Sequence, residues 1–108
     1  MTRADVLAAI AANKTVGDVD LSGIDLSGAD LTGGRFWGTT LTGANLSGAN
    51  IRKTGFKKCR LTGAVFAGTD LTKLDLRGVD LTGADLRGAT IYMTNFSDAD
   101  LSGARFAG

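Results

Sequence analysis

The residues with the clearest potential for chemistry are five cations in the middle of the chain, in the segment GANIRKTGFKKCRLTG at residues 48–63. Within nine positions this segment holds Arg52, Lys53, Lys57, Lys58 and Arg60. Residues 31–69 carry six cations and no acid, a charge of +6, whereas residues 1–30 carry −3 and residues 70–108 carry −2. Such a local excess of positive charge could attract the carboxylates of a protein or the phosphates of a nucleic acid.

The wider charge pattern favours a protein as the partner. The net charge of the whole chain is only +1, which argues against a strongly basic nucleic-acid binder. Because the segments on either side are rich in Asp, they would repel a phosphate backbone. We therefore expect a protein partner with an acidic surface and no binding to nucleic acid.

Catalytic chemistry finds little support in the sequence, which contains no His and no Glu. The one thiol, Cys59, falls where the repeat described below places side chains inward, and a buried thiol without a neighbouring base is inert. Short carboxylates in turns accept hydrogen bonds from nearby backbone amides, which explains the recurring Asp residues without a metal. We expect no enzyme, no cofactor and no metal site. The recurring acids are Asp20, Asp25, Asp30, Asp70, Asp75, Asp80, Asp85 and Asp100.

The sequence carries no sign of export. A single cysteine cannot form an internal disulfide, and the N-terminal residues lack the pattern of a signal peptide. No apolar run approaches the roughly 18 residues of a membrane-spanning helix. We expect a cytoplasmic location and no membrane association.

A five-residue period organises the chain from Val19 onward and must position these side chains. Residues 19–108 divide into 18 consecutive pentapeptides, and the third residue of each is Leu, Ile or Phe. The first residue is small or aliphatic, and 13 of the fifth residues are Gly. A period of five fits neither an α-helix nor a β-strand. We expect a coil that turns a corner at each pentapeptide and buries its first and third residues against the coils above and below.

A second period of 20 residues sets each coil at four pentapeptides. Residue n should therefore stack on residue n+20, at about the 4.8 Å spacing of neighbouring strands. Two sets of large apolar residues recur at this spacing: Leu21, Leu41, Leu61, Leu81 and Leu101, and Phe36, Phe56 and Phe96.

This pattern resembles that of the pentapeptide-repeat proteins, whose repeat A-[D/N]-L-x-x appears directly in ADLTG, ANLSG and ADLRG. The resemblance covers residues 19–108 and implies an all-β fold, a right-handed quadrilateral β-helix of about four and a half coils. It does not imply one function, because members of the family differ in what they do. Some protect DNA gyrase by imitating the acidic surface of duplex DNA, but the basic middle of this chain argues against a topoisomerase-binding DNA mimic.

Residues 1–18 fall outside the five-residue period and are predicted to form a short helix with a connector. The segment TRADVLAAIAANK is rich in Ala, and Thr2 with Asp5 three residues later is typical of a helix start. We expect a helix over residues 2–13 that covers the first coil, as the ends of solenoids require. Its apolar face holds Val6, Leu7 and Ile10.

The 20-residue stacking rule spreads the basic residues over several coils, with Lys53 above Lys73 and Trp37 above Lys57. Trp37 falls where side chains point outward, which is unusual for the largest apolar residue, and aromatic and basic residues are enriched at interfaces. Glycine is also replaced at the fifth position on these faces, at Lys53, Lys58, Lys73, Met93 and Asp98. The predicted partner-binding patch comprises Trp37, Arg52, Lys53, Lys57, Lys58, Lys73, Arg77 and Tyr92.

The function expected from this pattern is a non-enzymatic protein-interaction module that presents a basic and aromatic patch on a rigid solenoid. A solvated face whose cations only keep the rod soluble is the competing interpretation of the patch. Two alternatives for the whole chain are a structural spacer and a fragment of a larger protein whose other domain holds the activity.

The C-terminal coil is predicted to form a homodimer interface. In this sequence only two residues follow Phe106, so no segment of the chain covers the last coil, and exposed apolar ends of solenoids associate. Coverage by residues outside this chain is the alternative. Dimerisation through the C-terminal end also occurs among the pentapeptide-repeat proteins that the chain resembles. The predicted interface comprises Ile91, Phe96, Leu101 and Phe106.

Overall fold

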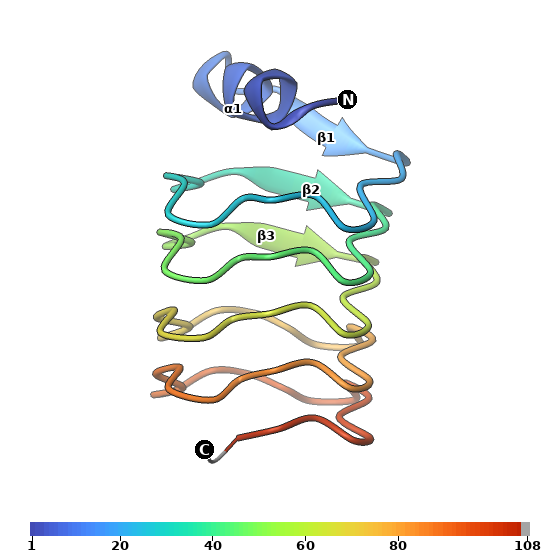
Figure 1. The fold of residues 1–108 in the computed structure, drawn as a ribbon, viewed down its shortest axis with the longest axis vertical. Helices are drawn as coiled ribbons and strands as arrows, with labels where there is room; N and C mark the ends of the chain where they lie inside the picture. Colours follow the sequence, from blue (N-terminus) through green and yellow to red (C-terminus); the bar gives the residue numbers. More distant parts are fainter. Residues whose placement is uncertain (107–108) are drawn as a thin grey trace.

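The chain winds into a stack of coils, as a computed structural model that describes residues 1–106 shows (Figure 1). One helix, α1 (Arg3–Ala11), lies at the N-terminal end of the stack. Three short strands follow, β1 (Thr15–Gly17), β2 (Arg35–Trp37) and β3 (Gly55–Lys57). They form one parallel sheet in the order β1-β2-β3. The molecule measures 35 × 23 × 22 Å, and its longest axis runs along the stack.

Each paired residue lies 20 positions from its partner. In the sheet, Val16 pairs with Phe36 and Phe36 with Phe56. Isolated parallel bridges extend the same register through the remaining coils, as far as Asp85 with Arg105. The predicted stacking of residue n on residue n+20 is confirmed. Because β1 begins at Thr15, this register also extends four residues ahead of the recognisable repeat.

The core is a column of the third residues of the pentapeptides. From Leu21 to Leu86 every third-position side chain is buried, and the rings of Phe36 and Phe56 stack in parallel with their centroids 5.5 Å apart. Most first-position residues, including Cys59, are buried as well. The predicted inward direction of both positions is confirmed.

Inward-facing threonines at the first position find partners in the preceding coil. Each donates its hydroxyl hydrogen to a backbone carbonyl 23 residues earlier, at 2.7–2.8 Å. Within residues 1–106, no buried side-chain nitrogen or oxygen lacks a hydrogen-bond partner. These hydrogen bonds join coils through the core, which the apolar pattern alone did not predict. The donor–acceptor pairs are Thr39 to Val16, Thr54 to Leu31, Thr69 to Leu46 and Thr94 to Leu71.

Helix α1 packs on the end of the stack through its apolar residues. The N–H of Asp5 donates to Oγ1 of Thr2 at 3.2 Å and the N–H of Thr2 donates to Oδ2 of Asp5 at 2.7 Å, so the predicted helix start is confirmed. Val6 is fully buried. A Cβ at Gly34 would lie 3.0 Å from Cδ1 of Ile10, so glycine at that position lets the helix approach closely. The helix ends earlier than predicted, because Asn13 adopts a left-handed backbone with φ of 59° before β1 begins.

Outward-facing acids organise the turns within each coil. Oδ1 of Asp20 accepts a hydrogen bond from the N–H of Ser22 at 2.9 Å, and Oδ1 of Asp75 accepts one from the N–H of Arg77 at 3.1 Å. Side-chain hydrogen bonds from Ser22 and Arg77, together with these backbone hydrogen bonds, hold the pKa of Asp20 and of Asp75 below its usual value, because they stabilise the ionised form. The predicted role of the recurring Asp residues as acceptors for turn amides is confirmed.

A charge placed in the core column should unfold the coil stack. Leu61 is fully buried, so Leu61→Asp would place a carboxylate among apolar side chains without a partner. We expect the free energy of unfolding to fall by about 3–5 kcal/mol, measured by urea denaturation. Ala67→Asp, at an outward position of the next pentapeptide, is the control and should change stability little. Equal stability of Leu61→Asp and the wild type would contradict the inward assignment.

Acid should destabilise the fold through the turn carboxylates. Side-chain hydrogen bonds from Arg77 and Arg87 lower the pKa of Asp75 and of Asp85 from 3.8 to about 2. Because the folded-state pKa is depressed, this stabilisation is complete above the unfolded pKa and is lost as the pH falls through the folded pKa. The melting temperature should therefore fall between pH 4 and pH 2. A melting temperature that stays constant over this interval would show that the carboxylates do not stabilise the turns.

Candidate interaction surface

The predicted partner-binding residues are exposed, and five of the eight line one of two hollows. Arg52, Lys53 and Lys73 line one cleft, which we call the basic corner. Trp37 and Lys57 line a second hollow on the face that carries β2 and β3. The remaining predicted residues are Lys58, Arg77 and Tyr92, of which Tyr92 lies in the basic corner's stacking column and is 66% exposed.

The basic corner is a cleft of about 340 Å³, which Asp70 and Thr72 also line. Its two lysines occupy the fifth position of their pentapeptides and have left-handed backbones, with φ of 58° at Lys53 and 62° at Lys73. The carboxylate of Asp70 accepts hydrogen bonds from Thr72. The cleft therefore presents three cations around one acid that already has a partner.

The left-handed backbone recurs at the fifth position throughout the repeat. Twelve glycines adopt it, with φ between 63° and 73°. A side chain in this conformation costs about 1–2 kcal/mol relative to the right-handed regions, so glycine is the residue that the backbone favours. Five side chains nevertheless occupy such positions within the repeat: Lys53, Lys58, Lys73, Met93 and Asp98.

Trp37 is held at the surface between cations. Its side chain is 44% exposed, and the ammonium nitrogen of Lys58 lies 5.9 Å from the ring centroid, within cation–π distance. In the parallel register Trp37 pairs with Lys57. The predicted outward direction of Trp37 and its column with Lys57 are confirmed.

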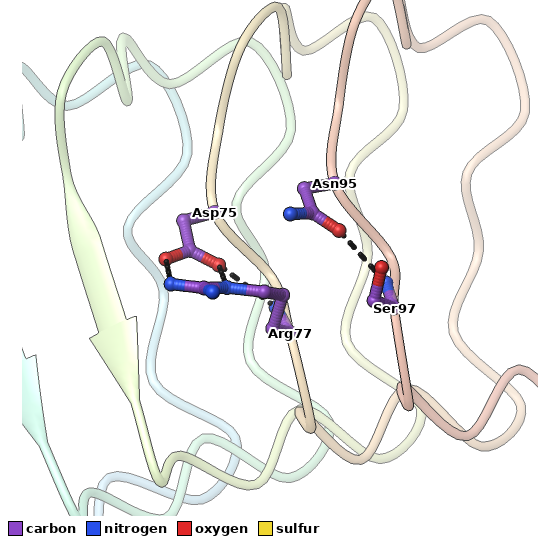
Figure 2. A network of polar contacts seen from close by, with 4 residues as sticks. All are labelled: Asp75, Arg77, Asn95 and Ser97. Atoms are coloured by element: carbon purple, nitrogen blue, oxygen red, sulfur yellow. Dashed lines mark hydrogen bonds and ion pairs between the residues drawn. The ribbon is translucent and has the colours of Figure 1, made fainter.

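Arg77 is already paired within its own coil. Its Nε donates to Oδ1 of Asp75 and its Nη2 to Oδ2, both at 2.8 Å, which is a two-pronged ion pair (Figure 2). Figure 2 also shows the next coil, where a neutral pair of Asn95 and Ser97 takes the same place. The charge of Arg77 is therefore compensated, unlike that of the lysines nearby.

A groove that the sequence did not reveal lies beside Trp37. It has a volume of about 540 Å³ and a mainly apolar surface, and we call it the Trp37 groove. Gly55 stands between Arg35 and Asp75 in the outward column of this face, so the column has a gap where a side chain would be. The groove is lined by Thr15, Arg35, Phe36, Trp37, Gly55, Phe56, Lys57 and Asp75.

The predicted dimer-interface residues gather at the C-terminal end of the stack. Ile91 and Phe106 are each 43% exposed, although the third-position residues of the inner coils are buried. Phe96 and Leu101 are half-buried, and the rings of Phe96 and Phe106 meet edge to face at 6.5 Å. This end therefore presents an apolar surface, to which the exposed Met93 also contributes.

Metal and thiol chemistry find little support in residues 1–106. No group of three His, Cys, Asp or Glu side chains in this part of the chain is placed to hold a metal ion. The thiol of Cys59 is buried, and its burial raises its pKa. The same part of the chain contains no helix that is long and apolar enough to cross a bilayer.

Solved structures of other proteins share the fold. HetL, a pentapeptide repeat protein involved in heterocyst differentiation regulation from the cyanobacterium Nostoc sp. strain PCC 7120, is 28% identical with a TM-score of 0.75. A trypsin-treated variant of QnrB1, a plasmid-mediated fluoroquinolone resistance protein, is 30% identical with a TM-score of 0.78. Each match covers 84% of this chain, which spans only 46% of HetL and 47% of QnrB1. Rfr23 from the cyanobacterium Cyanothece 51142, at 22% identity and a TM-score of 0.79, supports the fold alone.

The sequence itself matches a known family. No curated protein matches the chain. The family described as Pentapeptide repeats, however, matches 8 copies of its repeat over residues 20–57, 56–88 and 80–108. These segments coincide with the stacked coils and with the five-residue period that builds them. The chain therefore belongs to the pentapeptide-repeat family.

Proposed function

We propose that the chain is a non-enzymatic, cytoplasmic protein-interaction module that binds an acidic protein partner. In this proposal residues 1–18 are a cap and connector, and residues 19–108 are a right-handed quadrilateral β-helix of about four and a half coils. The basic corner and the side chains around Trp37 form the binding surface. The rigid stack would hold these side chains in place before the partner arrives, which lowers the entropy lost on binding.

The main support for the proposal is that three lysines have a left-handed backbone conformation. The backbone at Lys53, Lys58 and Lys73 has the same conformation as at the twelve glycines, so glycine would serve the fold better there. A side chain kept in a strained conformation points to a role outside folding. Solubility alone would be served equally well by cations at outward positions with an ordinary backbone.

The charges of these lysines are available to a partner. Within residues 1–106, ion pairs join only Asp75 to Arg77 and Asp85 to Arg87. Lys53, Lys58 and Lys73 are exposed and enter neither pair. The same holds for Lys57. Carboxylates on a partner could therefore reach them without breaking an internal interaction, and long-range attraction would speed the encounter.

Replacing the two lysines of the basic corner by glycine should separate binding from stability. We expect Lys53→Gly with Lys73→Gly to raise the free energy of unfolding by about 1 kcal/mol for each residue, because the backbone strain is relieved. The same variant should lose capture of its partner from a lysate that the wild-type chain captures. Thermal unfolding and quantitative mass spectrometry of the captured proteins measure the two effects.

Met93→Gly is the matched control for this variant. Met93 occupies the same column and has φ of 57°, so its replacement relieves the same strain without removing a charge. Its stability should rise while capture persists, and capture should weaken as salt is added. Capture by the double lysine variant at the wild-type level would refute the proposed function.

We also propose that a second copy of the chain covers the C-terminal end of the stack. The support is the apolar surface of Ile91, Phe96, Leu101 and Phe106, since exposed apolar patches of this kind mark interaction sites. Two identical ends can meet about a twofold axis, which closes the assembly at a dimer.

Sedimentation equilibrium should show a dimer that Phe106→Arg converts to a monomer. The arginine would place two like charges at the centre of the symmetric contact, where each would be desolvated. Ser102→Arg, at an exposed position of the same coil, is the control and should remain dimeric. A wild-type chain that stays monomeric at all accessible concentrations would exclude this dimer.

A further inference from the structure

The Trp37 groove exists because one residue of an outward column lacks a side chain. Gly55 lies between Arg35 and Asp75 in that column, and the groove opens over its backbone. Beneath it lie Phe36 and Phe56, whose rings are almost fully buried. Beside it stand the half-exposed ring of Trp37 and the side chain of Lys57.

The fold does not require glycine at this position. The backbone of Gly55 lies outside the left-handed region, and a Cβ built there would meet no atom within 4 Å. Val65 occupies the corresponding second position of its own pentapeptide, AVFAG, so the repeat accepts a branched side chain there. Glycine inside a strand is also destabilising. In the folded structure, Gly55 leaves the space above it open.

The rim of the groove carries uncompensated positive charge. Lys57 borders it and Lys58 covers the ring of Trp37, whereas Asp75 is neutralised by Arg77. The guanidinium of Arg35 also lines the groove but is already engaged, since it donates to Oδ1 and O of Asn13 at 2.8 and 2.6 Å and to Oγ1 of Thr15 at 3.3 Å. The mainly apolar groove is therefore bordered by Lys57 and, at the ring of Trp37, by Lys58, and neither lysine forms an ion pair within residues 1–106.

We infer that the Trp37 groove binds a peptide segment of the acidic partner, with one apolar side chain inserted over Gly55 and flanking carboxylates on Lys57 and Lys58. This inference rests on the proposed function and specifies its partner. The mainly apolar groove beside the exposed ring of Trp37 matches an aliphatic or aromatic side chain, and the lysines match acidic neighbours. A second copy of this chain fits less well, because two such faces would bring their lysines together.

The groove can be tested with synthetic peptides and the intrinsic fluorescence of the chain. Trp37 is the one tryptophan in the sequence, so its emission reports directly on the groove. The first probe is a tryptophan-free nonapeptide with a central Leu flanked by Asp and Glu. The second replaces the Leu by Gly, and the third keeps the Leu but replaces the acids by Asn and Gln.

The wild-type chain should bind the first probe with a saturable change in Trp37 emission, and the other two about tenfold or more weakly. Gly55→Val should fill the groove, so its affinity for the first probe should fall by a similar factor while its melting temperature stays that of the wild type. Ala67→Leu adds the same three carbons to a side chain that does not line the groove, so it should bind like the wild type.

Several outcomes would overturn the inference. The first is that the wild-type chain does not bind the first probe, or binds the first two probes equally. The second is that Gly55→Val binds the first probe as tightly as the wild type. The third is that Trp37 emission changes with protein concentration in the absence of peptide, which would indicate a second copy. The lysine-to-glycine capture experiment at Lys53 and Lys73 tests the proposed function separately. Capture lost there with Gly55→Val binding normally would leave the basic corner as the site and exclude the groove.

Discussion

The stacking of one inward side chain on another, 20 residues apart, is the constraint on which the rest of the structure depends. Every third-position side chain from Leu21 to Leu86 is buried, and each coil gains this burial only from its neighbours. Because a pentapeptide turns after each inward residue, the strands are no longer than three residues and most pairing occurs through single bridges. The core is therefore narrow, and its stability grows with each coil added.

The same constraint determines where function can reside. First and third residues are committed to the core, and the fifth residue must adopt a left-handed backbone in almost every unit. Variation is free only at the outward positions and, at a cost in strain, at the fifth position. Lys53 and Lys73 occupy that strained position, and Gly55 leaves an outward position empty. These two departures from the repeat, lysine at the fifth position and glycine at an outward position, lie on adjoining parts of the surface. The inward residues of the same coils keep the usual apolar pattern.

Much of this arrangement could be predicted from the sequence, because the period of five is unbroken from Val19 and the inward residues are of one kind. The helix start at Thr2 and the acceptor role of the Asp residues followed from local rules that hold in any fold. The sequence did not predict that β1 stacks on β2, since TVG at residues 15–17 lacks the pattern of the repeat. Its position in the stack follows only from its pairing with Arg35–Trp37.

The surface was less predictable than the core. An acid two residues before an arginine, as in Asp75 and Arg77, signals an ion pair only once the turn brings the two side chains together. The Trp37 groove depends on a missing side chain at Gly55 and on the direction that Arg35 takes toward Asn13. The groove has no periodic signature, because it arises from contacts between different coils.

Cross-linking by cysteine would test the 20-residue register most directly. Residues stacked at about 4.8 Å fall within the roughly 4.4–6.8 Å between Cα atoms that a disulfide requires. In a Cys59→Ala background, Thr62→Cys with Thr82→Cys should therefore form an intramolecular disulfide on mild oxidation. Thr62→Cys with Thr72→Cys, half a coil apart, should stay reduced. Cross-linking of the ten-residue pair, or of neither pair, would contradict the stacked coil.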